Sequence, residues 1–138
     1  METGIKVGDC MRKALATIGF NDSVISAAKA MKKSDVGSLL VTDANNEIFG
    51  IVTTTDIVRK SVAAGSLEDR VEKICSTTLL SVSPEIDISD AAALMGKSKV
   101  KRLVVKSSGK VVGMISQRDL IKISPSLYDL IAEKTHFG

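Results

Sequence analysis

The chain has 138 residues, of which 44% are hydrophobic, 25% charged and 3% aromatic, and its formal net charge is +3. These values are typical of a globular domain with an aliphatic core. The mild charge and the few aromatic side chains disfavour nucleic-acid binding, which uses dense basic faces and aromatic stacking. No apolar run approaches the ~20 residues that span a bilayer, and the first ten residues lack the apolar core of a signal peptide. We therefore expect a cytoplasmic protein without a membrane segment.

The first repeat of secondary structure starts after a short lead-in. Val24, Ala27, Ala28 and Met31 follow the spacing of one helix face, and either Asp22 or Ser23 can cap this helix. Around this helix the pattern predicts three strands and a second helix: Ala16–Ile18, Ser38–Thr42, Ile48–Thr53 and Thr55–Ala63.

A linker follows, in which Ser66 is expected to cap a helix over Leu67–Ile74. The second repeat then has Asp87 as the cap of a helix whose apolar face starts at Ile88. The other expected elements of this repeat are Leu80–Val82, Arg102–Lys106, Lys110–Ser116 and Arg118–Ile123.

The C-terminal segment "SPSLYDLIAEK" predicts one more helix, with Ser124 as its cap and Pro125 in its first turn. Leu127, Leu130 and Ile131 would form its apolar stripe. This helix has no counterpart in the first repeat. It is expected either to fold back on its own domain or to join a neighbouring subunit.

The two halves align from Val7 and Val71 to Asp56 and Asp119, at an offset of 64 residues that becomes 63 after a shorter loop. The clearest match is "GIVTTTD", which starts at Gly50, with "GMISQRD", which starts at Gly113. We expect an α/β fold of two β-α-β-β-α units, since one such unit buries too little surface to be stable alone. The expected boundaries are 1–65 for the first unit, 66–123 for the second and 124–138 for the tail.

The sequence resembles the tandem cystathionine-β-synthase (CBS) domain pair, or Bateman module. The features that carry the resemblance are the "VGDCM" opening, the helices "DSVISAAKAM" and "DISDAAALM", the strand "VKRLVV" and the two "GxxT/SxxD" endings. The resemblance implies that the two units pack sheet to sheet around a pseudo-twofold axis, with dimerisation into a disc. It also implies a regulatory role, with AMP, ADP, ATP or S-adenosylmethionine bound in clefts between the units.

The residues of the two "GxxT/SxxD" endings are the main candidate ligand contacts. Asp56 and Asp119 each follow a strand, where a carboxylate can accept hydrogen bonds from both vicinal hydroxyls of a ribose. Thr53 and Ser116 can donate to a phosphate oxygen, a role that the resemblance also implies. The alternative is that each hydroxyl and carboxylate only cap the helix that follows.

The two copies differ at the start of the middle strand. The second copy has Lys101 and Arg102 there. The resemblance implies that these two residues contact the phosphates of a ligand whose ribose is held by Thr53 and Asp56. The alternative interpretation is that Lys101 and Arg102 lie on a solvated strand edge and bind nothing. The opposite cleft would combine Ser116, Arg118 and Asp119 of the second copy with Gly37 and Ser38 of the first. We therefore expect the cleft of Asp56 to bind a phosphate-bearing ligand more strongly.

The resemblance also assigns contacts with the adenine base to Thr17, Ile18, Ser81 and Val82, for which a plain core role is the alternative. The expected partners are an adenosine nucleotide, a second copy of the chain in a homodimer, and a protein that receives the signal. The rival function is a dimerisation or docking module without a ligand. A sensor of S-adenosylmethionine is a further alternative.

Neither catalysis nor metal binding is indicated by the sequence. The two cysteines, Cys10 and Cys75, lie far apart without a CxxC motif, and His136 is the single histidine, so no zinc site is expected. Free thiols are expected because no secretion signal is present, with a disulfide as the alternative. No nucleophile has a neighbouring base in a recognisable arrangement, and we expect no enzyme.

Overall fold

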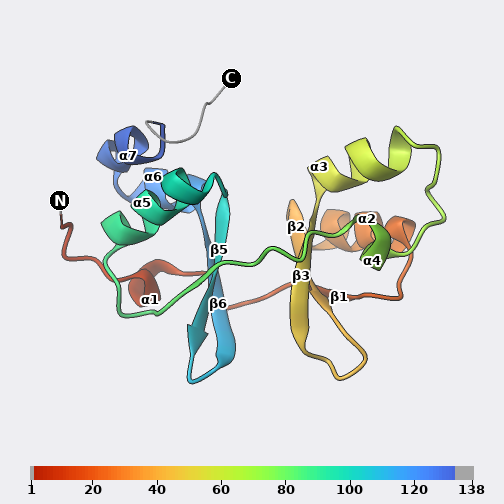
Figure 1. Ribbon diagram of the computed structural model, residues 1–138, viewed down its shortest axis with the longest axis horizontal. Helices are drawn as coiled ribbons and strands as arrows, with labels where there is room; N and C mark the ends of the chain where they lie inside the picture. The colour runs from red at the N-terminus through yellow and green to blue at the C-terminus, as the bar shows by residue number, and fades with distance from the viewer. Residues whose placement is uncertain (1, 133–138) are drawn as a thin grey trace. The chain divides into compact units, whose positions relative to one another are not determined.

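The computed structural model describes residues 2–132 (Figure 1). The chain folds into two compact units. The first, here called the middle unit, is the continuous segment Leu15–Leu79. The second, here called the split unit, combines Met1–Ala14 with the chain from Leu80 onward. Each unit contains one three-stranded sheet, which confirms the expected α/β fold with two similar units.

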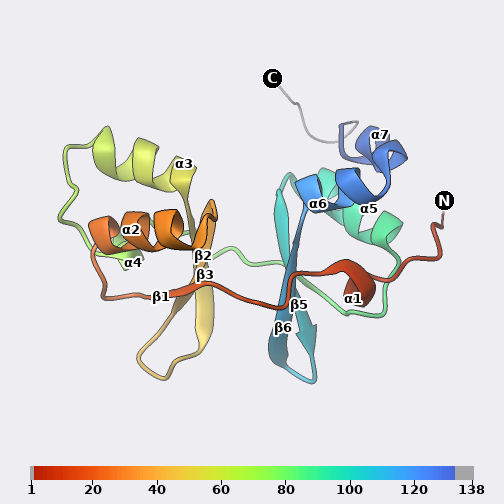
Figure 2. The same ribbon diagram turned by 180° about the vertical axis from the view of Figure 1, so that it is seen from behind.

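The middle unit holds the first repeat. Its sheet has the order β1-β2-β3, with β1 parallel to β2 and β2 antiparallel to β3. The helices α2 and α3 lie on the same side of this sheet in both views (Figure 1, Figure 2). The elements are β1 (Thr17–Gly19), α2 (Val24–Ser34), β2 (Ser38–Thr42), β3 (Ile48–Thr53), α3 (Thr54–Asp56), the π-helix η1 (Ile57–Val62) and α4 (Val71–Ile74).

The split unit repeats this plan with the order β4-β5-β6 and the same strand directions. Its C-terminal helix α7 packs on α5. The elements are α1 (Val7–Cys10), β4 (Ser81–Val82), α5 (Ile88–Ser98), β5 (Arg102–Ser107), β6 (Lys110–Ser116), α6 (Gln117–Ile123), the 3-10 helix η2 (Pro125–Leu127) and α7 (Tyr128–Ala132).

The two long helices begin at caps that their sequences predict. The side chain of Ser23 accepts a hydrogen bond from the backbone of Ser26 at the start of α2, and Asp87 accepts one from Ser89 at the start of α5. Each helix ends at a left-handed residue, Asp35 in α2 and Lys99 in α5. This left-handed ending lets the chain turn directly into the next strand.

The segments that precede each repeat are exchanged between the units. We call residues 2–14 and 66–79 the lead-in segments. The first precedes the middle unit's β1 but packs in the split unit, whereas the second precedes β4 but packs in the middle unit. The expected boundary at residues 65 and 66 follows the repeat in the sequence. The compact units divide the chain elsewhere because each sheet is completed by the lead-in segment of the other repeat.

Backbone hydrogen bonds hold each lead-in segment beside the last strand of the sheet. Arg12 donates to the carbonyl of Met114 at 2.8 Å and accepts from its N–H at 3.0 Å. Ser76 and Ile51 form the same pair of bonds at 2.8 and 2.9 Å. The repeat therefore extends to these long-range contacts, although the aligned local sequences "CMRK" and "ICST" differ.

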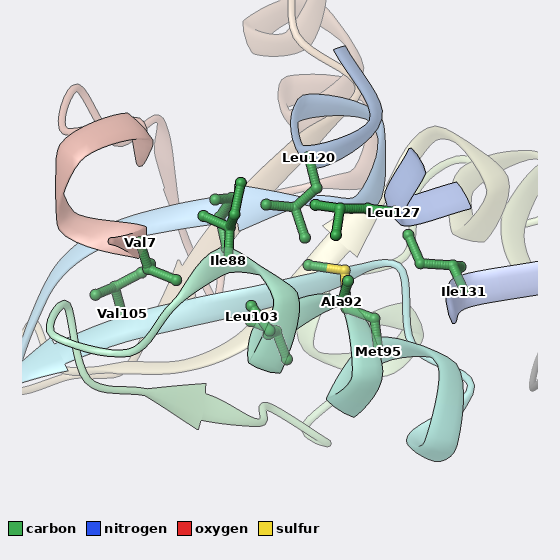
Figure 3. Packing of buried hydrophobic residues seen from close by; sticks show 11 residues of the cluster. Val7, Ile88, Ala92, Met95, Leu103, Val105, Leu120, Leu127 and Ile131 are labelled. Carbon is green, nitrogen blue, oxygen red and sulfur yellow. The ribbon is translucent and has the colours of Figure 1, made fainter. Parts of the chain in front are cut away.

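Each unit has its own hydrophobic cluster. In the split unit the cluster includes Val7 from α1 as well as Leu127 and Ile131 from the C-terminal segment, all fully buried (Figure 3). The C-terminal helix therefore folds back on its own unit, which is one of the two arrangements expected for it. Residues 133 and 134 of the predicted helix, and His136, lie outside the described residues.

The capping prediction for the linker is wrong. The linker is helical only over Val71–Ile74, and Arg70 rather than Ser66 is its N-cap. The turn before it is closed by a backbone hydrogen bond from Asp69 to the carbonyl of Ser66. At the C-terminal segment Ser124 is the N-cap residue and Pro125 occupies the first turn, as predicted, although the side chain of Ser124 makes no capping hydrogen bond.

Candidate functional site

The candidate residues of the first copy meet where β3 ends. The hydroxyl of Thr53 accepts a hydrogen bond from the backbone of Asp56 at 3.2 Å, and Asp56 Oδ2 accepts from the backbone of Thr53 at 3.0 Å. The Thr53 hydroxyl also lies 3.1 Å from Oδ2, to which it donates. The other oxygen, Oδ1, lies 3.1 Å from the ammonium of Lys60, one helical turn further along. The predicted helix cap is therefore present, with a cation added to it.

The second copy has the same reciprocal pair of hydrogen bonds at the end of β6. We call this arrangement of hydroxyl and carboxylate the box. The hydroxyl of Ser116 accepts from the backbone of Asp119 at 3.1 Å, and Asp119 Oδ2 accepts from the backbone of Ser116 at 3.2 Å. Its cation comes from a distant part of the chain. Arg12 of the first lead-in segment donates through Nε to Oδ2 at 3.3 Å and through Nη2 to Oδ1 at 3.1 Å.

The guanidinium of Arg12 stabilises the ionised form of the Asp119 carboxyl. Burial raises the pKa of Asp119, but hydrogen bonds from Arg12 and Ser116 outweigh this effect, so the pKa lies below its ordinary value. Asp119 is consequently ionised at neutral pH. An ionised carboxylate is the form that accepts hydrogen bonds from hydroxyl groups.

In each unit the start of the central strand, β2 or β5, lies beside the box of that unit. The carbonyl of Gly37 accepts from Thr54 at 3.0 Å, and the carbonyl of Lys101 accepts from Gln117 at 2.8 Å. Ser38 is paired with Thr53 in the ladder, and Arg102 is paired with Ser116. The structure therefore brings Gly37 and Ser38 to the box of Asp56, and Lys101 and Arg102 to the box of Asp119.

The chemistry of these neighbouring positions differs between the copies. Ser38 is buried, whereas Lys101 is exposed and Arg102 is half-buried. Arg118, also predicted as a contact, is exposed on α6 next to Asp119. The split unit thus has cationic residues at the positions next to its box where the middle unit has Gly37 and Ser38. The predicted use of Lys101 and Arg102 with Thr53 and Asp56 joins residues of different units and stays a prediction.

The four residues predicted to contact adenine lie on the short strands β1 and β4. Thr17 and Ser81 are exposed, and each begins its strand. Ile18 and Val82 are half-buried and pack against the core cluster of their own unit. The core role is thus present for these two apolar residues, and contact with a base remains a prediction for all four.

Arg12 is the residue of this site that the sequence did not reveal. Arg12 belongs to the first repeat, and its aligned counterpart in the second repeat is Ser76. Only the exchange of the lead-in segments brings it to the carboxylate of the second copy. Lys60 could have been found, because an acid and a base four residues apart on a helix commonly pair.

A comparison with protein-family models decides the family. The model described as CBS domain matches this chain twice, at residues 7–63 and 71–126. The chain belongs to the CBS domain family. Both matches end close to the last helix of a repeat, and the second begins at α4, so the family's own CBS unit includes the lead-in helix.

Known proteins are similar in sequence to most of this chain. The CBS domain-containing protein YhcV of Bacillus subtilis is 30% identical over 115 residues, which are 83% of this chain and 81% of the relative. An uncharacterized 17.7 kDa protein of Acidianus ambivalens is 35% identical over 103 residues. That match spans 74% of this chain and 62% of the archaeal protein, which is therefore the longer of the two.

Solved structures show the same CBS fold. A protein with CBS domains from Burkholderia ambifaria is 34% identical, with a TM-score of 0.75 over 83% of this chain and 85% of that one. The hexameric CBS-CP12 protein of bloom-forming cyanobacteria is 28% identical, with a TM-score of 0.77 over 91% and 73%. A CBS domain pair in complex with 5′-methylthioadenosine and S-adenosyl-L-methionine has a TM-score of 0.77 over 88% and 96%, at 24% identity.

Three further findings concern the chemistry of the CBS pair. Within residues 2–132, no helix is long and apolar enough to cross a membrane. The same residues contain no group of three His, Cys, Asp or Glu side chains that could hold a metal ion. Cys10 and Cys75 are free thiols, and burial raises the pKa of both.

Proposed function

We propose that this CBS pair is a regulatory module that binds an adenosine nucleotide (AMP, ADP or ATP) and passes the signal to a protein partner or to its own oligomeric state. The observation that carries the proposal is the repeated box of hydroxyl and carboxylate at the ends of β3 and β6. The proposal assigns no catalytic residue.

The chemistry of the box suits a ribose. Asp56 and Asp119 are each largely shielded, with side-chain exposures of 13% and 14%, yet both can still be reached from solvent. A carboxylate has about four lone-pair positions, so it can accept hydrogen bonds from two vicinal hydroxyls. Each such charge-assisted bond contributes about 1.5–3 kcal/mol before the carboxylate's desolvation is subtracted.

The phosphates of the nucleotide would be bound by cations. Lys101 is exposed at the start of β5, and Arg118 is exposed on α6. Both offer donors that favour a phosphate oxygen over an uncharged group. These cations support a nucleotide more than a nucleoside as the ligand.

S-adenosylmethionine is the second ligand that we consider. A CBS pair of the same fold is described in complex with this molecule and with 5′-methylthioadenosine, so the fold can hold an adenosyl ligand. Both ligands share the ribose with AMP, and the same carboxylates would bind it. The nucleotides and S-adenosylmethionine therefore differ in the charged group attached to the adenosine, and this group decides between them.

A docking module without a ligand is the second candidate function. It is favoured by the ion pairs with Lys60 and Arg12, since both carboxylates already have partners inside their own units. In this function the boxes would serve only as helix caps. The module would act by assembling into a homodimer or by binding another protein.

Isothermal titration calorimetry with AMP, ATP and S-adenosylmethionine tests the proposal. We expect a dissociation constant on the order of micromolar for one of the nucleotides, which corresponds to about −8 kcal/mol. The absence of both heat and a melting-temperature shift with all three compounds would favour the docking module. Light scattering with and without the ligand then shows whether binding changes the oligomeric state.

A further inference from the structure

The ion pair between Arg12 and Asp119 joins the lead-in segment to the candidate ribose-binding carboxylate. Both carboxylate oxygens receive a guanidinium N–H, at 3.3 Å for Oδ2 and 3.1 Å for Oδ1. The backbone of Arg12 is fixed beside β6 by its two hydrogen bonds with Met114. Its side chain is 57% exposed, so the guanidinium can swing away into water without disturbing the backbone.

The middle unit provides an internal comparison. Ser76 takes the place of Arg12 there and has the same backbone bridge, to Ile51. The cation at Asp56 is instead Lys60, whose ammonium lies 3.1 Å from Oδ1 and also donates to the carbonyl of Ile74 at 3.2 Å. The carboxylate of Asp56 thus faces an ammonium group, whereas both oxygens of Asp119 accept hydrogen bonds from the guanidinium of Arg12.

A ribose that uses Asp119 must compete with this forked guanidinium. We propose that Arg12 is a specificity-determining residue, which holds Asp119 in the unliganded protein and restricts this position to ligands that bring an anionic group for the displaced guanidinium. This inference rests on the proposed ligand binding, and it adds the ligand class that the Asp119 position selects.

The charge balance explains the selection. A nucleoside 5′-phosphate supplies hydroxyls for the carboxylate and oxyanions for Arg12, so both charges keep a partner after the exchange. Guanidinium binds phosphate through two parallel hydrogen bonds as readily as it binds carboxylate. An uncharged nucleoside offers nothing to the guanidinium, and its binding loses the ion pair. The Asp119 position should therefore prefer AMP over adenosine, to a degree set by Arg12.

The test compares AMP and adenosine in calorimetric titrations. The substitution Asp56→Asn is made first, so that the remaining binding reports on the Asp119 position. Arg12→Ser is then added, which installs the residue that Ser76 provides at this place in the middle unit, while Lys13→Ser serves as the control because Lys13 is an exposed neighbouring cation. Arg12→Lys keeps the positive charge but removes the fork.

We expect Arg12→Ser to reduce the preference for AMP over adenosine by about 1.5-fold to fivefold, the range for an exposed ion pair. Arg12→Lys should give an intermediate preference, and Lys13→Ser should leave it unchanged. A purely structural role of Arg12 would weaken both ligands equally, and an unchanged preference would therefore overturn the inference.

Two other outcomes separate this inference from the proposed function. In the first outcome the wild type binds AMP, but neither Asp56→Asn alone nor Asp56→Asn combined with Arg12→Ser does. The Asp119 position then takes no ligand. The selection by Arg12 is then refuted while the proposed function stands. If neither the wild type nor Arg12→Ser binds any of the compounds, both are refuted.

Discussion

Gly50 lies directly under the backbone of Ser76, where the second lead-in segment crosses β3. A Cβ atom at Gly50 would come within 2.9 Å of the Ser76 carbonyl oxygen and 3.3 Å of Cys75 Sγ. At Gly113 the same atom would lie 3.0 Å from the carbonyl oxygen of Arg12. The repeated glycine is therefore required by the crossing of the lead-in segment.

This crossing predicts that Gly50→Ala destabilises the protein. The carbonyl of Ser76 cannot easily retreat because it accepts a hydrogen bond from Ile51. Overpacking of this kind typically costs about 1–3 kcal/mol of unfolding free energy, which urea denaturation can measure. Gly37→Ala is the control, since its Cβ would have only Thr54 Oγ1 at 4.0 Å. Equal stability of the two variants would contradict the crossing.

The exchange of lead-in segments predicts which core residues are energetically coupled. Val7 is fully buried in the same cluster as Val105, whereas Val41, the counterpart of Val105, belongs to the other cluster. Each Val→Ala change should cost about 2 kcal/mol of unfolding free energy. In double-mutant cycles, Val7 and Val105 should show a coupling of at least about 0.5 kcal/mol, and Val7 and Val41 should be additive. The reverse pattern would place the first lead-in segment in the middle unit.

The N-cap of α5 predicts a loss of stability in acid. Hydrogen bonds from the backbone and hydroxyl of Ser89 and from Thr3 hold the pKa of Asp87 well below its ordinary value. A carboxyl with a lowered pKa stabilises the folded state above the pKa of the unfolded chain, and this contribution fades as the pH falls toward the folded-state pKa.

Melting temperatures of Asp87→Asn between pH 7 and pH 3 check this effect. The variant should melt below the wild type at pH 7, and the difference should shrink below about pH 4, where the unfolded carboxyl begins to take up protons. Asp90→Asn, in the first turn of the same helix, is the control and should show a smaller difference. A difference that is constant with pH would refute the role of the Asp87 charge.

The two carboxylates should not contribute equally to nucleotide binding. We expect Asp56→Asn to weaken AMP binding more than Asp119→Asn, by about tenfold or about 1.4 kcal/mol. At Asp119 the ribose must first displace the guanidinium of Arg12, which donates to both carboxylate oxygens, whereas the cation at Asp56 is the ammonium of Lys60, 3.1 Å from Oδ1. Calorimetry of the two single variants measures the difference. A larger loss with Asp119→Asn would overturn this order.

Much of the fold could be predicted because its signals are local. The helix-face spacing around Val24 and Ile88 gave α2 and α5, and the strand runs gave both hairpins to within a few residues. The capping boxes at Asp56 and Asp119 followed from a hydroxyl three residues before an acid. The predicted linker helix is too long because the stretch after Ser66 forms turns and only Val71–Ile74 is helical. Tertiary contacts override weak helix propensity there.

The sequence by itself determined the repeat, the helices, the hairpins and the two boxes, since each depends on residues within a few positions of one another. Only the tertiary structure decided which sheet each lead-in segment joins. That choice buries Val7 among residues of the second repeat and brings Arg12 to Asp119 across 107 positions. A backbone bridge to Met114 needs no particular side chain, so it leaves no pattern in the sequence from which the pairing could be predicted.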